Sequence, residues 1–295
     1  NTVTGTGPMG RVLESDLTSA AAPVAAVAAP VAKAAAPGAP APKAAPVFAA
    51  PRPEVRAGEE KVVQITDAVG KGMVKSMNEA LKVPIMALGE EIDMTAMLHL
   101  TKGLKEQATK KYGTKVTVTS YMIKAMSLAL AEHPKVNSKF GTAVDVPEYT
   151  MYGSHNISVA IDTPFGLVVP NIKDCANLSV VEIQMELMRL AAAANAGKLA
   201  IGDIKGGTIA LSNIGVIGTK DPRPIPFDGQ AVIGASGRTM MLPRYNAKGE
   251  LVPRQIMQIR WVGDHRHLDG ATLARFSNSF KRYMEDPNEW TLAMR

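Results

Sequence analysis

Hydrophobic positions along this chain recur with two different periods, and each period predicts one type of element. Near the C-terminus, Leu273, Phe276, Phe280 and Tyr283 recur at helical spacing, and Pro287 marks the end of that helix. Directly before this helix, hydrophobic and polar residues alternate as they do in a half-buried strand. The two patterns together predict helices at 66–81, 94–110, 120–132, 179–196 and 271–287, and strands at 84–92, 154–161, 166–172, 208–212, 231–235 and 255–262.

The ends of these elements carry signals of their own. Ser179 and Glu182 have the spacing of a capping box, and Gly197 stops the same helix. Pro84 and Pro134 end the helices before them, because proline lacks the backbone N–H that a helix needs. Long helices mixed with strands in irregular order predict an α/β fold of the α+β kind, a mixed-sheet sandwich, and not a barrel of repeated strand–helix units.

The N-terminal part of the chain has a different composition. Residues 1–18 hold a glycine-rich turn and the apolar side of one short helical turn, which is too little to bury a core alone. Residues 19–58 are predicted to be a disordered Ala/Pro linker, because repeated prolines prevent helix and sheet from propagating. Residues 59–295 then form one domain. Since the chain begins with Asn1, we expect it to be a fragment, with any targeting segment outside it.

Composition narrows the function classes. With 46% hydrophobic and 20% charged residues among 295, the chain has enough material for a sizeable core. The net charge of +6 is spread along the sequence without interleaved aromatics, which gives no support to a nucleic-acid partner. No segment reaches the roughly 20 apolar residues of a membrane span. The single cysteine, Cys175, excludes an internal disulfide framework and is interpreted as structural.

The strongest candidate for chemistry is the run Asp264-His265-Arg266-His267-Leu268-Asp269-Gly270, between the last strand and the last helix. A histidine in such a turn can exchange a proton near neutral pH, because imidazole ordinarily titrates there. We take His265 as the candidate base and Asp269 as its support. The alternative is a solvated polar turn without a catalytic role.

A second candidate lies at the end of the predicted strand 208–212. Glycines flank this strand and would let a ligand approach its backbone, so Ser212 is a candidate hydrogen-bond donor to an oxyanion. The alternative is a Ser-Asn pair that only starts a turn. Asp162 ends another strand, where a carboxylate either binds a ligand or caps a turn. His99, His133 and His155 lack metal-ligand spacing, so no metal site is predicted.

Several short motifs, in order and at similar spacing, together resemble one family. They are 5–16, the 19–58 linker, Ser154-His155-Asn156-Ile157, Leu211-Ser212-Asn213-Ile214-Gly215, Ala231-Val232-Ile233-Gly234-Ala235, Pro243-Arg244-Tyr245-Asn246, His265-x-x-x-Asp269-Gly270 and Arg275-Phe276-Ser277-Asn278. The chain is identified by them as similar to the dihydrolipoamide acyltransferases, the core components of 2-oxo acid dehydrogenase complexes, and most of all to the branched-chain type. The resemblance makes residues 1–18 the end of a peripheral-subunit-binding domain and 59–295 the catalytic acyltransferase core.

This resemblance implies an enzyme that transfers an acyl group between a dihydrolipoyl arm and coenzyme A. His265 would be the general base, Ser212 the oxyanion donor and Asp269 a residue that holds the geometry, while Asp162, Asn213 and Gly237 would contact coenzyme A. The lipoyl group would be carried on a domain outside this chain. The implied fold is like that of chloramphenicol acetyltransferase, with His265 and Ser212 supplied by different subunits of a homotrimer.

The same resemblance implies a setting. Trimers would assemble into a cubic or icosahedral core, and decarboxylase and dihydrolipoamide dehydrogenase components would bind through the N-terminal domain. The implied compartment is the mitochondrial matrix, with bacterial cytoplasm or plastid as alternatives. Acetyl transfer in a pyruvate dehydrogenase complex, a stand-alone acetyltransferase and a non-catalytic scaffold remain as alternative functions. The spacer argues against the stand-alone enzyme, and the intact His265 argues against the scaffold.

Three positions depart from the family pattern. His267 stands where the family usually has an apolar residue, so a second imidazole either shifts the titration of the first or points into solvent. The segment Thr219 to Phe227 has a sequence of its own. Thr101-Lys102 replaces an arginine that the resemblance leads us to expect near Leu100, which removes an expected contact to the coenzyme A phosphates.

Overall fold

The structure is a computed structural model, and it describes residues 55, 58–141 and 146–290. Internal contacts divide the chain into two units, Asn1–Lys61 and Val62–Arg295. The predicted binding-domain remnant, residues 1–18, and nearly all of the predicted linker, residues 19–58, lie outside the described residues. The second unit holds every described helix and strand. None of the described helices is long and apolar enough to cross a membrane.

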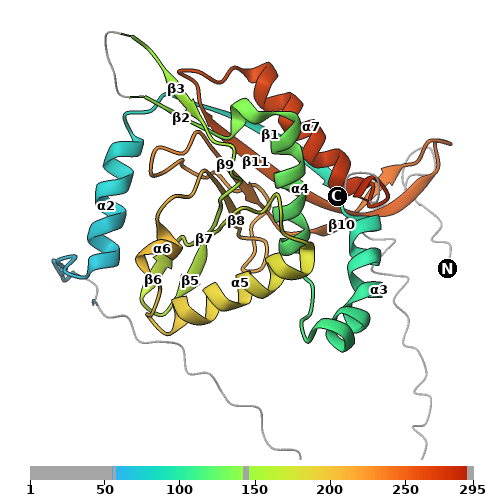
Figure 1. Ribbon diagram of the computed structural model, residues 1–295, viewed down its shortest axis with the longest axis horizontal. Coiled ribbons are helices and arrows are strands. Elements are labelled where there is room, and N and C mark those ends of the chain that lie inside the picture. Colours follow the sequence, from blue (N-terminus) through green and yellow to red (C-terminus); the bar gives the residue numbers. More distant parts are fainter. Residues whose placement is uncertain (1–54, 56–57, 142–145, 291–295) are drawn as a thin grey trace, which may run out of the picture. The chain divides into compact units, whose positions relative to one another are not determined.

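The core of this unit is a mixed sheet, which within the described residues has seven strands in the order β1-β11-β9-β8-β4-β7, with β10 paired to β11 (Figure 1). β8 runs parallel to both β4 and β9, whereas β11 is antiparallel to β9, β1 and β10. Two small two-stranded sheets, β2 with β3 and β5 with β6, lie beside it. The strands are β1 (Ile85–Asp93), β2 (Ser138–Phe140), β3 (Tyr149–Met151), β4 (Ile157–Val159), β5 (Ile161–Thr163), β6 (Gly166–Val168), β7 (Asn171–Ile172), β8 (Ile209–Asn213), β9 (Val232–Ser236), β10 (Met240–Tyr245) and β11 (Leu251–Asp264).

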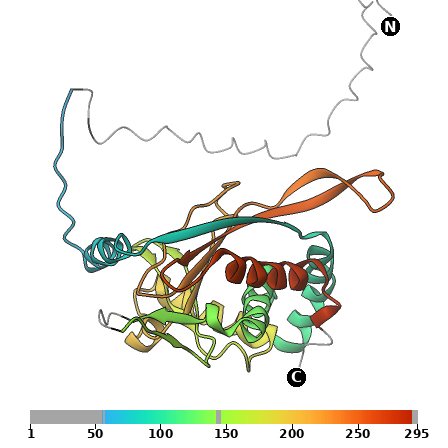
Figure 2. The same ribbon diagram turned by 90° about the horizontal axis from the view of Figure 1, so that it is seen from above.

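Helices cover one side of the long strands, where the red α7 and the green α4 lie on the same side of the teal β1 (Figure 2). The core centres on Trp261 of β11, whose indole meets the rings of Phe276 and Phe280 edge to face at 4.9 and 5.1 Å between centroids. Gly234 in β9 leaves room for this indole, because a Cβ there would overlap Cζ3 of Trp261. The helices are α2 (Ala68–Ala80), α3 (Thr95–Tyr112), α4 (Val118–Glu132), α5 (Val180–Asn195), α6 (Ile201–Ile204) and α7 (Gly270–Glu285), with a 3₁₀ turn at Pro134–Val136.

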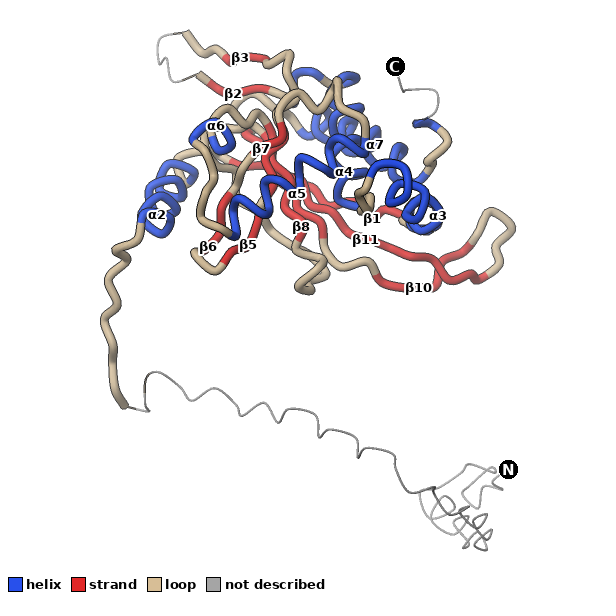
Figure 3. The backbone as a smooth tube through the Cα atoms, turned by 60° about the horizontal axis from the view of Figure 1, so that its bottom comes forward, coloured by secondary structure: helices blue, strands red, loops and turns tan. Residues whose placement is uncertain are grey.

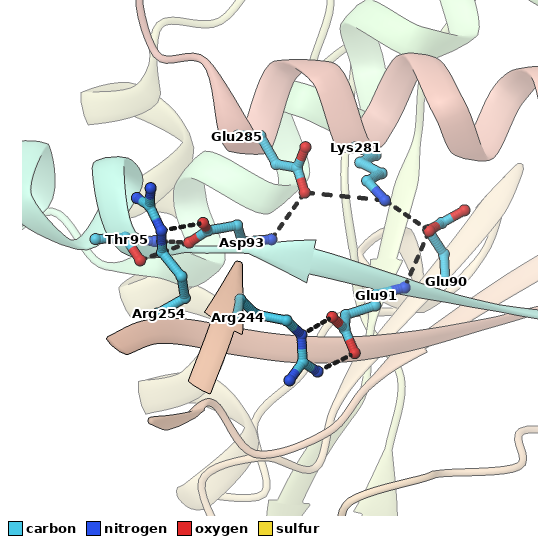
Figure 4. Close-up of polar contacts among 8 residues, drawn as sticks. All are labelled: Glu90, Glu91, Asp93, Thr95, Arg244, Arg254, Lys281 and Glu285. Carbon is cyan, nitrogen blue, oxygen red and sulfur yellow. Dashed lines mark hydrogen bonds and ion pairs between the residues drawn. The ribbon is translucent and has the colours of Figure 1, made fainter. Parts of the chain in front are cut away.

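The hairpin of β10 and β11 projects beyond the rest of the sheet (Figure 3). Ion pairs fasten the hairpin to β1 (Figure 4). Nε and Nη2 of Arg244 contact the two carboxylate oxygens of Glu91 at 2.7 and 2.6 Å, which holds the pKa of Glu91 below its usual range. Arg254 lies 3.5 Å from Asp93, a weaker pair. The hairpin leaves apolar side chains of both strands in solvent: Met241, Tyr245 and Leu251 are 67%, 77% and 65% exposed.

Most predicted elements are confirmed, and the exceptions have physical causes. The mixed α/β class and all five predicted helices are present, with the capping box of Ser179 and Glu182 intact. The predicted strand 154–161 is split between β4 and β5, and 166–172 is split at Pro170. The first part of the predicted strand 166–172 forms β6 at the surface, where Gly166 and Leu167 are exposed. The prediction missed β10, the short β2 and β3, and α6.

The helix predicted at 66–81 forms as α2, but its apolar side is not buried within this chain. Met73, Val74 and Leu81 are 45%, 47% and 80% exposed, and Ala80 alone is buried in the helix. The hydrophobic spacing therefore predicts the helix correctly, but the described part of the chain offers no surface that buries its apolar side. An apolar stripe of this kind is typical of a surface covered by another chain.

Candidate active site

His265 is the first residue after β11, in the turn that leads to α7. Its backbone N–H donates to the carbonyl of Pro84 at 2.8 Å, which ties the turn to the start of β1. Its side chain is exposed, and Nδ1 lies 2.8 Å from the carbonyl oxygen of Leu268. Because a carbonyl only accepts hydrogen bonds, Nδ1 carries the proton of the neutral ring and Nε2 keeps the lone pair. The turn therefore holds this imidazole ready to accept a proton at Nε2.

Asp264 and Arg266, on either side of His265, stabilise the turn. The Asp264 side chain is almost fully buried, and its carboxylate accepts from Nε and Nη2 of Arg266 at 2.9 and 2.6 Å. The guanidinium of Arg266 also stacks over the ring of Phe140, 4.3 Å from its centre. A buried carboxylate is tolerated when its charge is paired in this way. The pair fixes the backbone on both sides of the candidate base.

His267 packs against the β2–β3 hairpin, so of the two alternatives for this residue, the one in which it points into solvent is wrong. Its ring stacks on Tyr149 at 5.0 Å between centroids, and Nε2 lies 2.8 Å from Oγ of Ser138. The Ser138 hydroxyl already donates to the carbonyl of Lys135, so it accepts from Nε2–H of His267. Burial lowers the pKa of this ring. These contacts give the second imidazole a packing role.

Asp269 is the N-cap of α7. Its carboxylate accepts from the backbone N–H of Thr272 at 2.7 Å, and this hydrogen bond lowers the pKa of Asp269. The imidazole of His265 is oriented by the Leu268 carbonyl and not by this carboxylate. Asp269 thus acts on the turn by fixing where α7 begins, since a capping side chain satisfies a free N–H of the first turn.

Ser212, Asn213 and Gly237 are brought together at the end of the parallel strands β8 and β9, where Asn213 pairs with Ser236. The Ser212 side chain is half-buried, and its hydroxyl has no hydrogen-bond partner among the described residues. The side chain of Asn213 is held at both ends, since it donates to Oγ1 of Thr119 and accepts from the N–H of Gly215, each at 3.1 Å. The hydroxyl of Ser212 is therefore the free donor of this group.

Asp162 lies in β5, close to the same strand end. The chain enters β5 through Ala160, whose N–H donates to the carbonyl of Leu211 at 3.2 Å, directly before Ser212. The Asp162 side chain is exposed. Ser212, Asn213 and Gly237 thus lie at the end of β8 and β9, and Asp162 follows in the small β5–β6 sheet, two residues after Ala160.

His265 and Ser212 are far apart within one chain. Ser212 pairs with Ala235, and Ala235 pairs with Arg260, so Ser212 lies level with Arg260 two strands away. His265 follows Arg260 by five residues along β11. With about 3.3 Å per residue and about 4.8 Å per strand, their Cα atoms lie about 16 Å apart along the strands and about 10 Å across them. One chain does not bring the candidate base and the candidate donor into contact.

Two cavities among the described residues do not join the two groups either. A cleft of about 480 Å³ is lined by residues of α2, the 226–230 loop, Asp264 and Arg266, but not by His265. A second cavity, of about 410 Å³, lies at 151–156 and 206–208. None of the predicted site residues lines either cavity. Among the described residues, no three His, Cys, Asp or Glu side chains gather as a metal site.

Sequence reasoning named the candidate residues and missed the contacts that hold them. The Leu268 carbonyl that orients His265 leaves no trace in the sequence, because every residue has a carbonyl. The pairing of Asp264 with Arg266 was also missed, although opposite charges two residues apart in a turn were a signal for it. Cys175 is interpreted correctly as structural: burial raises the pKa of its thiol to about 12.

Comparison with known proteins shows which family the chain resembles over most of its length. Residues 57–292 match the family described as 2-oxoacid dehydrogenases acyltransferase (catalytic domain). The mitochondrial lipoamide acyltransferase component of the branched-chain alpha-keto acid dehydrogenase complex of Mus musculus is 39% identical over 288 residues. That alignment covers 97% of this chain and 59% of the mouse protein, so the chain spans about three-fifths of its relative.

Two solved structures have the same fold over most of the chain. One is the dihydrolipoamide acetyltransferase of Azotobacter vinelandii, studied for the roles of one serine, one histidine and one asparagine in its catalytic mechanism. The other is the cubic core of a pyruvate dehydrogenase multienzyme complex. Each is 28% identical, covers 81% of this chain and 98% of its own, and has a TM-score of 0.74. Together with the matched residues 57–292, these likenesses establish that the chain belongs to the acyltransferase family of the 2-oxoacid dehydrogenases, whose catalytic domain it contains.

Proposed function

We propose that this chain transfers acyl groups between a dihydrolipoyl thiol and coenzyme A. The observation that carries the proposal is the state of His265, whose Nδ1–H is committed to the Leu268 carbonyl while Nε2 remains available as a base. The unpartnered hydroxyl of Ser212 is the matching oxyanion donor. The Azotobacter vinelandii enzyme supports both roles, since a histidine and a serine act in its mechanism. Its asparagine follows its histidine by four residues, the spacing at which Asp269 follows His265 here.

The reaction needs one proton transfer in each direction. A free thiol ordinarily titrates near 8.5, so a base raises its nucleophilicity at neutral pH. Nε2 of His265 accepts the proton of the coenzyme A thiol while the sulfur forms a bond to the carbonyl carbon of the acyl-dihydrolipoyl thioester. The carbonyl oxygen becomes negative, and the Ser212 hydroxyl donates to it. The bond from carbon to the dihydrolipoyl sulfur then breaks, and the imidazolium returns the proton to that sulfur.

The site is formed between two chains. Ser212 and His265 are separated by about 16 Å along the strands and about 10 Å across them within one chain, well beyond any shared contact with one thioester. In a closed ring of subunits, the end of β8 that carries Ser212 in one subunit is able to face the turn that carries His265 in the next subunit. The exposed apolar side chains of α2 and of the β10–β11 hairpin support a chain that is covered by copies of itself.

The oligomer, in this proposal, is a homotrimer that builds the core of a 2-oxo acid dehydrogenase complex. The cubic core formed by a 28% identical relative supports this assembly. Decarboxylase and dihydrolipoamide dehydrogenase components bind through the N-terminal domain. A branched-chain acyl group is favoured over acetyl, because identity rises to 39% with the branched-chain enzyme of Mus musculus. The mitochondrial name of that relative supports the mitochondrial matrix as the compartment.

The first test measures transfer from isobutyryl-, isovaleryl- and acetyl-coenzyme A to dihydrolipoamide, together with the particle mass of the same sample. His265→Ala is expected to lower turnover by about 10²- to 10⁴-fold without changing the mass, because it removes the general base. His99→Ala is the matched control, since His99 is an exposed histidine outside the site. Near-normal turnover of His265→Ala would contradict the proposed chemistry.

A further inference from the structure

The turn that carries His265 is joined to the β2–β3 hairpin by a closed ring of hydrogen bonds. The N–H of Asp264 donates to the carbonyl of Ala231 at 2.8 Å, and the N–H of Ala231 donates to the carbonyl of Ser138 at 3.0 Å. The side chain of His267 completes the ring, since its Nε2–H donates to Oγ of the same Ser138 at 2.8 Å. One residue of β2 therefore holds the turn on both sides of His265.

The imidazole of His267 contacts two aromatic rings of the hairpin, and a cation lies over each of these rings. Between centroids, it stacks on Tyr149 of β3 at 5.0 Å and lies 5.7 Å from Phe140 of β2. Nζ of Lys135 lies 5.6 Å from the centre of the Tyr149 ring. The guanidinium of Arg266 lies 4.3 Å from the centre of the Phe140 ring. The surroundings of this imidazole are thus aromatic and positively charged.

These surroundings fit a neutral imidazole and not an imidazolium. Nε2 of His267 carries the proton that Ser138 accepts, so Nδ1 holds the lone pair, and Nδ1 is buried with no hydrogen-bond partner among the described residues. A proton added at Nδ1 would be a buried donor without an acceptor, close to the charges of Lys135 and Arg266. Asp264, the carboxylate that faces the ring, is already paired with Arg266 at 2.6 Å. Burial accordingly lowers the pKa of His267.

The contacts of His267 reach the candidate base through the next residue, Leu268. The side chain of Leu268 is buried, its N–H donates to the carbonyl of Asp264 at 3.1 Å, and its own carbonyl accepts from Nδ1–H of His265 at 2.8 Å. Because neighbouring residues share one backbone, separation of the His267 ring from Ser138 would move this carbonyl and turn the imidazole that depends on it.

Resting on the proposed function, we propose that His267 is a positioning residue for His265. Its neutral ring closes the hydrogen-bonded connection to Ser138 and so fixes the Leu268 carbonyl, and a proton taken up from solvent at Nδ1 releases that connection. Acid would therefore inactivate the site in two steps, one at the base itself and one at the residue that holds its turn.

The test is the pH dependence of kcat for acyl transfer in the whole oligomer, compared with His267→Gln and His267→Leu. In wild-type protein, kcat is expected to fall on the acid side with the uptake of two protons, one by His265 and one by His267. Glutamine retains an N–H donor for Ser138 but does not titrate, so His267→Gln is expected to keep most of the turnover at neutral pH and to lose it with one proton. Leucine neither donates nor titrates, so His267→Leu is expected to lower kcat about 2- to 10-fold with KM unchanged.

His99→Gln is the matched control, because His99 is an exposed histidine outside the site, and the loss with two protons is expected to remain. Wild-type protein that loses activity with a single proton would overturn the inference. So would a two-proton loss retained by His267→Gln. An equal drop in kcat in both His267 variants, with the acid side unchanged, would indicate packing alone and would overturn it as well.

Thermal unfolding separates this inference from the proposed function, because it requires no acyl transfer. Since the folded pKa of His267 is the lower one, the neutral ring stabilises the fold above the ordinary pKa of imidazole, and this contribution declines as the pH falls below it. His267→Gln is therefore expected to reduce the loss of Tm between about pH 7 and pH 5. A loss of Tm equal to that of wild-type protein would overturn the inference. If this loss is reduced but the wild-type protein transfers no acyl group at any pH, the proposed function alone is overturned.

Discussion

Each candidate residue of the site has one side-chain atom that is available for chemistry, and other contacts decide which atom that is. His265 offers Nε2 because the backbone of Leu268 occupies Nδ1, and Ser212 offers its hydroxyl because nothing in the described chain occupies it. The residue types of the site were predictable from the sequence. Their partners were not, because a backbone carbonyl is chemically the same at every position and its direction depends on the folded turn.

Substitution of the proposed oxyanion donor tests its role directly. Ser212→Ala is expected to lower kcat by about 10²- to 10³-fold, the usual loss when one such donor is removed, with little change in affinity for coenzyme A. Steady-state kinetics with acyl-coenzyme A and dihydrolipoamide measure both quantities. A raised KM with kcat preserved would assign Ser212 to binding instead.

Cys175 is expected to be inert in the folded protein. Burial raises its thiol pKa to about 12, so at pH 8 the side chain remains protonated and unreactive. A thiol reagent at pH 8 should label native protein far more slowly than protein in denaturant, where the thiol ordinarily titrates near 8.5. Because the folded pKa is the higher one, the burial of this thiol stabilises the fold at neutral pH, and that contribution declines as the pH rises toward 12. Equal labelling rates with and without denaturant would contradict the burial of Cys175.

At the scale of elements, hydrophobic spacing was a reliable guide wherever an element packs on its own chain. The helices α4, α5 and α7 and the strands β8 and β9 were predicted because their apolar sides are buried in the core. The hairpin strand β10 was missed, because Pro243 interrupts it and because alternate side chains along it are exposed. Its register comes from pairing with β11 and from the contact of Arg244 with Glu91, which are both long-range.

Two glycine substitutions are expected to change stability in opposite directions. Gly234→Ala should lower the free energy of unfolding by about 1–3 kcal/mol, because its Cβ overlaps the buried indole of Trp261. Gly103→Ala, at an exposed position of α3 with no atom within 4 Å of the new Cβ, should raise it by about 0.5–1 kcal/mol. Urea unfolding measures both. No destabilisation by Gly234→Ala would show that the packing around Trp261 differs from that described, and destabilisation by Gly103→Ala would contradict the open surroundings of that position in α3.

At the scale of the whole molecule, the sheet separates the two halves of the proposed chemistry. The end of β8 carries Ser212 and Asn213, whereas the end of the antiparallel β11 leads to His265. The resemblance to acyltransferases implies that these residues come from different subunits, and the strand register separates them within one chain. A trimer whose subunits meet head to tail would give three equivalent sites, each with His265 from one subunit and Ser212 from the next.

The most direct measurement of this central claim combines two inactive variants in one oligomer. Chains carrying His265→Ala and chains carrying Ser212→Ala are coexpressed in equal amounts, and acyl transfer by the mixed particles is compared with that of each variant alone. If the site lies between subunits, random assembly restores about a quarter of the sites. These are the sites in which one chain supplies an intact His265 and its neighbour supplies an intact Ser212. If both residues acted within one chain, every site would lack one of them, and mixed particles no more active than the single variants would contradict the intersubunit site.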